Sequence, residues 1–132
     1  MKSLSEMDIV QYIVMNKTVV DKLSRGALGA QVAHAAIAPI TMQLVKRREQ
    51  YTNIENSLDP IVWHWVTFTF TKIVLGCSGI RLAALICELE EREIKFHIIR
   101  ESRLAGVITG IGLLPQDKER VAPFFKDLRT LT

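Results

Sequence analysis

The chain has 132 residues, with 17 Lys plus Arg against 14 Asp plus Glu, so its formal net charge is +3. Apolar residues make up 48% of it, which is typical of a soluble globular domain. A chain of this size buries about two-thirds of its surface on folding, so we expect one domain over residues 1–132. The mild positive charge permits nucleic acid as a partner but does not require it.

Membrane, secreted and metal-binding classes are disfavoured by patterns that the sequence lacks. No uninterrupted apolar run reaches the roughly 18 residues of a membrane span. The N-terminus does not follow the pattern of a signal peptide, so we expect a cytoplasmic protein that does not enter a membrane. Cys77 and Cys87 are too few for a disulfide scaffold and have no partners at zinc-ligand spacing, so we expect free thiols and no metal site.

The first half of the chain predicts a strand followed by a long helix. Residues 9–15 are β-branched and apolar at both parities, as in a strand that is covered on both faces. Residues 26–45 are rich in Ala and Leu, which favours a helix, and Pro39 should kink or restart it. The polar residues 51–62 predict a loop, either without regular structure or with a helical turn in it.

The middle of the chain predicts a second strand and the clearest amphipathic helix. Residues 63–75 are rich in β-formers, and we place the core strand at 71–76. Ser78 is a good N-cap for a helix that begins at Gly79. Leucines and an isoleucine recur on one face of this helix, and charged residues lie on another.

The last third predicts two strands and a helix. Residues 95–100 and 107–113 have strand composition, and 116–128 predict a helix whose weak point is Pro123. Helices between strands imply parallel crossovers, and the short link between the third and fourth strands implies an antiparallel pair. The fold class is therefore α/β: a three-layer α/β/α domain around a four-stranded mixed sheet.

The most informative motif lies in the first half of the first helix. Gln31 and His34 are three residues apart, so they share one helix face among alanines and glycines. Small neighbours let another group approach that face closely. On spacing alone, the pair is either part of a site or a structural pair that satisfies its own hydrogen bonds.

The motif resembles the signature of the archaeal and eukaryotic (class II) peptidyl-tRNA hydrolases. Their first helix reads Gly-Lys, an apolar residue, then Ala-Ala-Gln-x-x-His-Ala. Residues 72–75 resemble the second strand of that family, and Gly110-Ile111-Gly112 resembles the Gly-Ile-Gly that ends its last strand. The resemblance spans roughly residues 8–129. In the helix the match includes Gly26, Leu28, Ala30, Gln31, His34 and Ala35.

The resemblance implies the strand order 2-1-4-3 with strand 4 antiparallel. It also implies hydrolysis of the ester that joins a peptide to tRNA, without metal or organic cofactor, by a homodimer. His34 would be the general base or position the water, and Gln31 would donate to the oxyanion or the substrate amide. Glu101 aligns with an Asp of the family and would hold His34 in one tautomer or replace it as base.

This chain departs from the family pattern at two places. The Lys after the first Gly is Ala27, and the segment after Glu101 lacks the family's Gly-x-Thr and is shorter. Both departures resemble a divergent branch, the peptidyl-tRNA hydrolase domain-containing proteins. The alternative function is therefore a weak or inactive family member that binds tRNA or a protein partner.

Basic and aromatic residues supply the remaining candidates. The basic residues near the first helix would bind tRNA phosphates or remain solvated charges, and Arg100 and Arg103 would bind the tRNA end or form a local ion pair with Glu101. Trp63, His64 and Trp65 would stack on bases or pack in the core or at a dimer face, and the dimer would use the segment between the first helix and the second strand. The candidate tRNA-binding residues are Lys22, Arg25, Arg100 and Arg103, with Lys17 as a further candidate.

Overall fold

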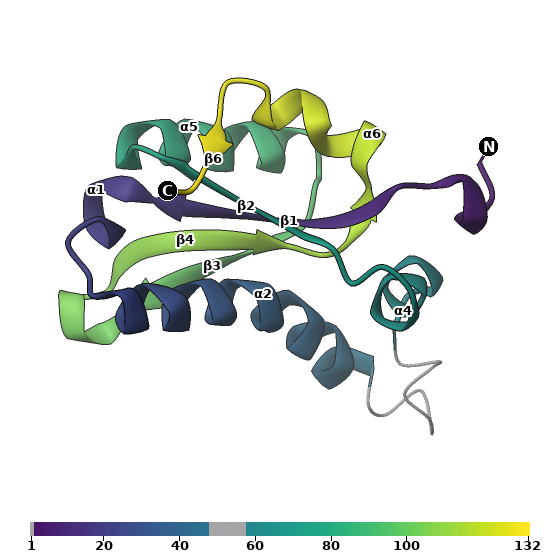
Figure 1. The fold of residues 1–132 in the computed structure, drawn as a ribbon, viewed down its shortest axis with the longest axis horizontal. Coiled ribbons are helices and arrows are strands. Elements are labelled where there is room, and N and C mark those ends of the chain that lie inside the picture. The colour runs from purple at the N-terminus through teal and green to yellow at the C-terminus, as the bar shows by residue number, and fades with distance from the viewer. Residues whose placement is uncertain (1, 48–57) are drawn as a thin grey trace.

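The computed structural model describes residues 2–47 and 58–132, and a mixed β-sheet lies at its centre (Figure 1). The two strands β1 (Ile9–Asn16) and β2 (Lys72–Cys77) are parallel. Strand β4 (Val107–Leu113) is antiparallel both to β1 and to β3 (Phe96–Glu101), and the four longer strands lie in the order β2-β1-β4-β3. The α/β class is confirmed.

The expected number of strands was wrong, because the described residues form six. The two additional strands are β5 (Gln116–Asp117), which pairs with the start of β1, and β6 (Arg129–Thr130), which pairs with the end of β2. Each has only two residues, so neither carries an alternation that sequence periodicity can detect. Strand β5 continues in the direction of β4 along the start of β1, and β6 forms where the end of the chain returns to the edge of β2.

Helices cover both faces of the sheet. Helix α2 (Arg25–Arg47) lies on one face, and α5 (Gly79–Glu91) lies on the other with the short α6 (Lys118–Val121) (Figure 1). Every residue of β1 is buried, as predicted for a strand that is covered on both sides. The core cluster between the sheet and α2 includes Ile13, Met15, Ala35 and Ile99, and the cluster between the sheet and α5 includes Val10, Tyr12, Val14, Leu82, Leu85 and Leu89.

The N-terminus of α5 forms as predicted. The Ser78 hydroxyl accepts a hydrogen bond from the Arg81 amide at 3.1 Å, which satisfies one of the free N–H groups in the first helical turn. Upstream, the turn after β1 contains a short helix, α1 (Lys17–Val20), whose N-cap is Asn16. The cysteines Cys77 and Cys87 are both free.

Helix α2 lies very close to β4 at Gly112. Pro39 lies inside the helix and has no amide hydrogen, so the Ala35 carbonyl lacks its usual helical partner. That carbonyl faces Gly112, where a Cβ would lie only 1.7 Å from the Ala35 oxygen. The helix does not restart at Pro39, but its second half turns away from the sheet (Figure 1), which agrees with the predicted kink. Glycine at 112 is therefore required for this packing.

By length and composition alone, α2 is also long and apolar enough to cross a membrane, although its apolar residues do not form one uninterrupted run. Core helices of soluble proteins meet the same two criteria. Here Gln31, Ala35, Pro39 and Gln43 are buried in the domain, so the helix is one layer of the α/β fold.

The region before β2 differs from the prediction. The predicted loop at 51–62 lies partly outside the described residues, and 60–67 form a helix, α4 (Pro60–Thr67), where strand-like composition was expected. Pro60 occupies the first helical turn, and buried Val62 and Trp65 follow helical spacing. Trp65 is fully buried and donates to the Thr71 carbonyl at 2.8 Å, so it cannot contribute to a dimer face.

The predicted C-terminal helix over 116–128 was also wrong. Residues 116–117 pair as β5, α6 ends at Val121, and a 3-10 turn, η3 (Ala122–Phe125), follows. Pro123 lies in that turn, where its missing amide ends the α-helical hydrogen bonding. The remaining residues return to the edge of β2 and form β6.

Candidate active site

The candidate residues meet where β1, β2 and β3 end, the end of the sheet where α/β proteins bind ligands. Helix α2 begins there and contributes Gln31 and His34, and β3 ends there with Glu101. The short turn η2 (Ser102–Leu104) then leads into β4. This end lies on the left of Figure 1.

Helix α2 is capped by a residue that the sequence analysis did not single out. The Ser24 hydroxyl accepts a hydrogen bond from the Ala27 amide at 3.2 Å, and the Ser24 carbonyl accepts from Leu28. The cap fixes where the helix starts and hence which face carries Gln31. Ser followed by a helix-forming run is the sequence signal that identifies it.

Gln31 is buried and hydrogen-bonded at both ends of its amide. Its Nε2 donates to Glu101 Oε2 at 2.7 Å, and its Oε1 accepts from Thr109 Oγ1 at 2.7 Å. The bond to Glu101 joins α2 to the end of β3, as expected from a shared site. Because only 5% of Gln31 is exposed, its amide is committed to these two partners rather than to solvent.

Glu101 is held as a carboxylate by its surroundings. Its Oε1 accepts from the Arg103 amide at 3.0 Å, and the Arg103 Nε lies 3.6 Å from the same oxygen. The Arg103 amide is the main cause that lowers the pKa of Glu101, and Gln31, the Arg103 charge and His34 act in the same direction. Partial burial opposes them but does not prevail. The site therefore carries a stable negative charge.

His34 is exposed and lies close enough to Glu101 to influence its carboxylate. Among the described residues it forms no hydrogen bond, so Glu101 does not hold one tautomer of His34 in the way the resemblance implied. The influence of His34 on the Glu101 pKa nevertheless places the imidazole within electrostatic reach. The geometry thus joins Gln31 and Glu101 directly and His34 through its proximity.

Thr109 is the site residue that sequence reasoning missed. It is fully buried on β4, and its hydroxyl is the partner of Gln31 Oε1. A lone threonine in a strand carries no motif, and only the packing of α2 on β4 brings it to the amide. No sequence signal could have identified it.

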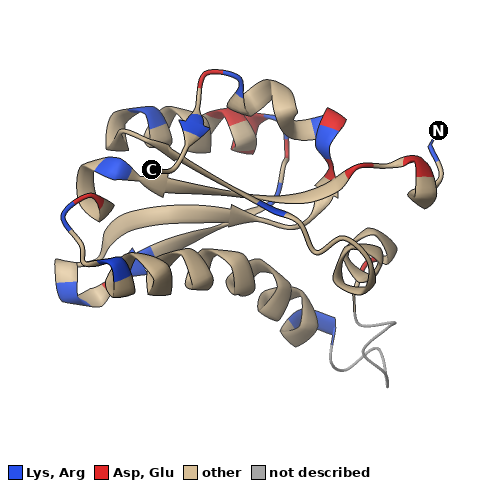
Figure 2. Ribbon diagram, in the orientation of Figure 1, with Lys and Arg blue, Asp and Glu red and all other residues tan. Residues whose placement is uncertain are grey.

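Figure 2 shows Lys and Arg residues in several ribbon segments at this end of the molecule. Lys22 and Arg25 precede or begin α2 and are exposed, and Arg103 projects from η2 with 90% of its side chain exposed. Arg100 is less free, because its guanidinium donates to the Gly106 carbonyl at 3.1 Å. Lys17 pairs with Asp21 at 3.2 Å.

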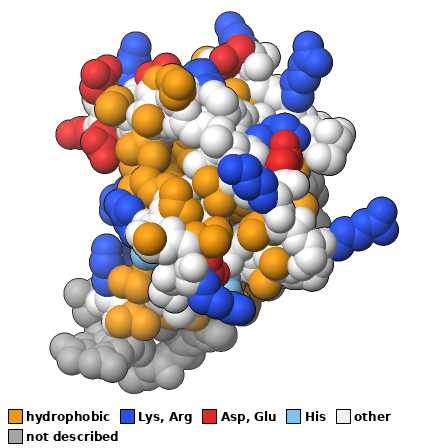
Figure 3. Space-filling view, turned by 90° about the vertical axis from the view of Figure 1, so that its left-hand side faces the viewer, with side chains coloured by type: hydrophobic (Ala, Val, Ile, Leu, Met, Phe, Trp, Pro, Cys, Tyr) orange, Lys and Arg blue, Asp and Glu red, His pale blue; other side chains and the backbone are white. Residues whose placement is uncertain are grey.

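Hydrophobic side chains gather in the middle of the same face, with Lys and Arg around them (Figure 3). A shallow groove there lies between α2 and the C-terminal strand, and Leu28, Val32, Val74 and Leu131 line it together with Arg25. An apolar surface with a cationic rim suits a ligand that is both anionic and partly apolar.

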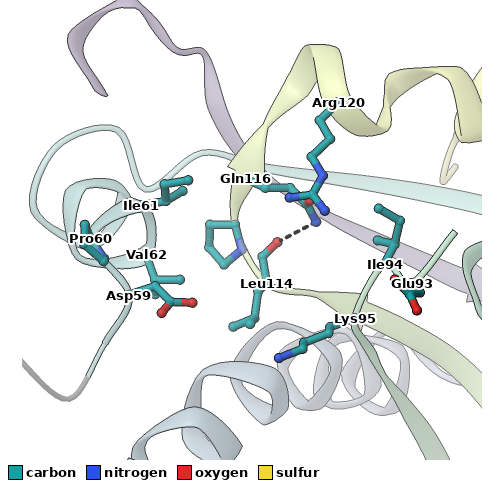
Figure 4. A pocket seen from close by; sticks show the side chains of 11 residues that line it. Asp59, Pro60, Ile61, Val62, Glu93, Ile94, Lys95, Leu114, Gln116 and Arg120 are labelled. Carbon is teal, nitrogen blue, oxygen red and sulfur yellow. Dashed lines mark hydrogen bonds between the residues drawn. The ribbon is translucent and has the colours of Figure 1, made fainter. Parts of the chain in front are cut away.

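A separate cavity of about 450 Å³ lies at the opposite end of the sheet. Figure 4 shows Lys95 and Arg120 beside it, with Leu114 between them and Gln116 donating to the Leu114 carbonyl. None of the candidate catalytic residues lines this cavity. Within residues 2–47 and 58–132, no cluster of three or more His, Cys, Asp or Glu side chains could hold a metal ion.

A sequence model described as peptidyl-tRNA hydrolase PTH2 matches residues 9–131, and the chain therefore belongs to this family of hydrolases. Among solved structures, a protein of unknown function, Atu0240 from Agrobacterium tumefaciens strain C58, is 14% identical with a TM-score of 0.56. The match covers 95% of this chain and 98% of that one, and at this identity it supports the fold alone. No curated protein matches the sequence.

Proposed function

We propose that this protein is a peptidyl-tRNA hydrolase that cleaves the ester between a peptide and the terminal ribose of tRNA in the cytoplasm. The observation that carries the proposal is the Gln31–Glu101 hydrogen bond beside exposed His34, in a chain whose family hydrolyses this ester. Ester cleavage needs an oriented water, a polarised carbonyl and a released ribose oxygen. Of these three requirements, the site directly supplies groups that can orient the water.

His34 is the proposed general base. Imidazole exchanges a proton near neutral pH, and an exposed ring can reach a water that approaches the substrate carbonyl. Glu101 is a poor base in this setting because its pKa is lowered by the Arg103 amide, Gln31 and nearby positive charge. Its proposed role is to stabilise the positive charge that His34 acquires when it takes the proton.

Gln31 has a different proposed role from the one that the resemblance implied. Its amide already donates to Glu101 and accepts from Thr109, and the side chain is buried. It therefore positions Glu101, and its second amide hydrogen is the only donor that remains for substrate. To donate to the oxyanion, the Gln31 Nε2 would have to use this second hydrogen while its first hydrogen stays on Glu101.

The basic rim is the proposed contact with tRNA phosphates. Arg25, Lys22 and Arg103 are exposed, while Arg100 would have to give up its bond to Gly106. Each phosphate contact contributes about one unit to the slope of log affinity against log salt. An Arg25→Ala/Arg103→Ala variant should therefore bind tRNA more weakly, with a salt slope that is flatter by up to about two units.

The alternative is a family member that binds tRNA or a protein partner with little or no hydrolysis. The observation that favours it is Ala27, which stands where the family has a Lys. An alanine can neither bind a phosphate nor stabilise an oxyanion. The short turn after Glu101 is the second departure.

The experiment compares purified wild type, His34→Ala and His97→Ala for hydrolysis of peptidyl-tRNA and for tRNA binding. His97 is the matched control, because it lies at the other end of β3. Loss of a general base lowers the rate by about 10²- to 10⁴-fold, so only His34→Ala should lose hydrolysis while its tRNA binding persists. Binding without hydrolysis in wild type would establish the alternative, and absence of both would reject the tRNA assignment.

A further inference from the structure

We propose that Thr109 is a positioning residue that sets the orientation of the Gln31 amide and, through it, holds the Glu101 carboxylate in place. The inference deepens the proposed function and depends on it only for the effect on hydrolysis. The positioning itself is a property of the free protein and can be tested without substrate.

A β-bulge aims Thr109 at α2. Across β3 and β4, Ile99 pairs with Gly110 and Arg100 pairs with Ile108, so Thr109 is the extra residue on its strand. In a regular strand, Ile108 and Ile111 would point to opposite faces, yet both pack in the core beneath α5. The bulge reverses the alternation between them, which leaves Thr109 on the face toward α2.

The Thr109 hydroxyl has one hydrogen to donate, and the distances to its two acceptors decide which of them receives it. Gln31 Oε1 lies 2.7 Å from Thr109 Oγ1, whereas the other available acceptor, the Ile99 carbonyl, lies 3.4 Å away. A short, well-placed acceptor takes the hydrogen in preference to a distant one. Thr109 therefore donates to the oxygen end of the amide, while Glu101, whose carboxylate can only accept, takes the nitrogen end.

Fixing the oxygen end directs the nitrogen end at Glu101. In the present orientation Gln31 Nε2 donates to Glu101 Oε2 at 2.7 Å. If the amide were reversed, Gln31 Oε1 would face the carboxylate at this distance, and two acceptor oxygens cannot form a hydrogen bond. Both Thr109 and Gln31 are buried, at 0% and 5% exposure, so water does not replace a lost partner easily. The three residues thus form one directional chain of hydrogen bonds from β4 through α2 to β3.

Removal of the hydroxyl should loosen the amide and weaken one of the two N–H donors on Glu101. The titratable or charged groups near this carboxylate are His34 from α2 and Arg103 from η2, and Arg100 on β3 is turned to the Gly106 carbonyl. None of these changes in a Thr109 variant. A rise in the Glu101 pKa would therefore report the loss of Gln31 donation.

The test titrates the Glu101 carboxyl carbon by NMR in wild type, Thr109→Val, Thr109→Ser and Thr69→Val. Valine keeps the shape of threonine without the donor, and serine keeps the donor. Thr69 is the matched control, since its hydroxyl bonds the Ile9 carbonyl away from the site. We expect a raised Glu101 pKa in Thr109→Val alone. An unchanged pKa in that variant overturns the inference.

Two further measurements separate this inference from folding and from the proposed function. In wild type the Gln31 side-chain amide hydrogens should exchange slowly with solvent, and fast exchange would overturn the inference even if Thr109→Val does not fold. In hydrolysis, Thr109→Val should lower kcat by up to about 100-fold with little change in KM, and Thr109→Ser should restore it. A pKa shift without wild-type hydrolysis would leave the positioning intact and reject the proposed function.

Discussion

Replacement of Gly112 by alanine should dislodge α2 from the sheet. A Cβ at this position would lie 1.7 Å from the Ala35 oxygen and 2.7 Å from its carbonyl carbon, both backbone atoms that no side-chain rotation can move. Ordinary contact needs more than about 3 Å, so the helix must shift by more than about 1 Å. Overpacking of this kind costs about 1–3 kcal/mol or more, a large part of a typical stability of about 5–15 kcal/mol.

Urea denaturation measures the loss, and two glycines in α2 provide the matched controls. At Gly26 and Gly29 a Cβ would meet nothing within 4 Å. Gly29→Ala should therefore leave stability unchanged or raise it by up to about 1 kcal/mol through helix propensity. Gly112→Ala should also lower hydrolysis, because Gln31 and His34 move with the helix. Wild-type stability in Gly112→Ala would refute the close-packing argument.

Three further predictions concern the turn after Glu101, the charge of Glu101 and the state of association. Ala105 has a φ of 56°, so Ala105→Gly should raise stability by about 1 kcal/mol in urea denaturation, and a loss would contradict the strain argument. The folded-state pKa of Glu101 is lowered, so its contribution is complete above about pH 4.3, the pKa of an unperturbed glutamate, and is lost as the pH falls further. Acid denaturation of Glu101→Gln should accordingly depend less on pH than that of wild type in this range. If the protein is a homodimer through the exposed apolar residues near α4, Phe68→Asp should shift light scattering toward monomer, with Ile80→Asp on α5 as the control; a monomeric wild type would reject the dimer.

The parts of the fold that the sequence predicts are those with a strong local pattern. Buried β1 is apolar at both parities, and α5 begins at a serine cap and repeats leucines at helical spacing. Strand β4 was predicted with the bounds that the structure shows, 107–113. In each case local propensity and burial favour the same element.

The errors occur where tertiary packing overrides local composition. The β-branched and aromatic residues of α4 favour a strand, but Pro60 starts a helix and Trp65 fills the core from it. The C-terminal residues have helical composition up to Pro123, but Arg129–Thr130 then pair with the free edge of β2 and form a strand. Neither outcome is visible without the rest of the sheet.

The candidate site divides in the same way. The Gln31 and His34 motif is local, and the alignment of Glu101 with a family carboxylate needs only the order of elements. The orientation of Thr109 depends on a bulge that shifts the side-chain alternation of β4, and the hydrogen bonding of Gln31 depends on Thr109. Sequence therefore identifies the chemical groups, while their hydrogen-bond directions need the structure.

The two candidate functions require different things of Glu101. A surface that only binds tRNA gains nothing from a carboxylate among its cations, because that charge repels phosphate. Here the carboxylate is nonetheless held charged by the Arg103 amide and by Gln31, and Gln31 is in turn held by a buried hydroxyl. The buried hydrogen bonds from Thr109 to Gln31 and from Gln31 to Glu101 hold a negative charge beside His34. A histidine that accepts a proton needs such a charge, and a phosphate-binding surface does not. This arrangement favours the hydrolase over the binding protein.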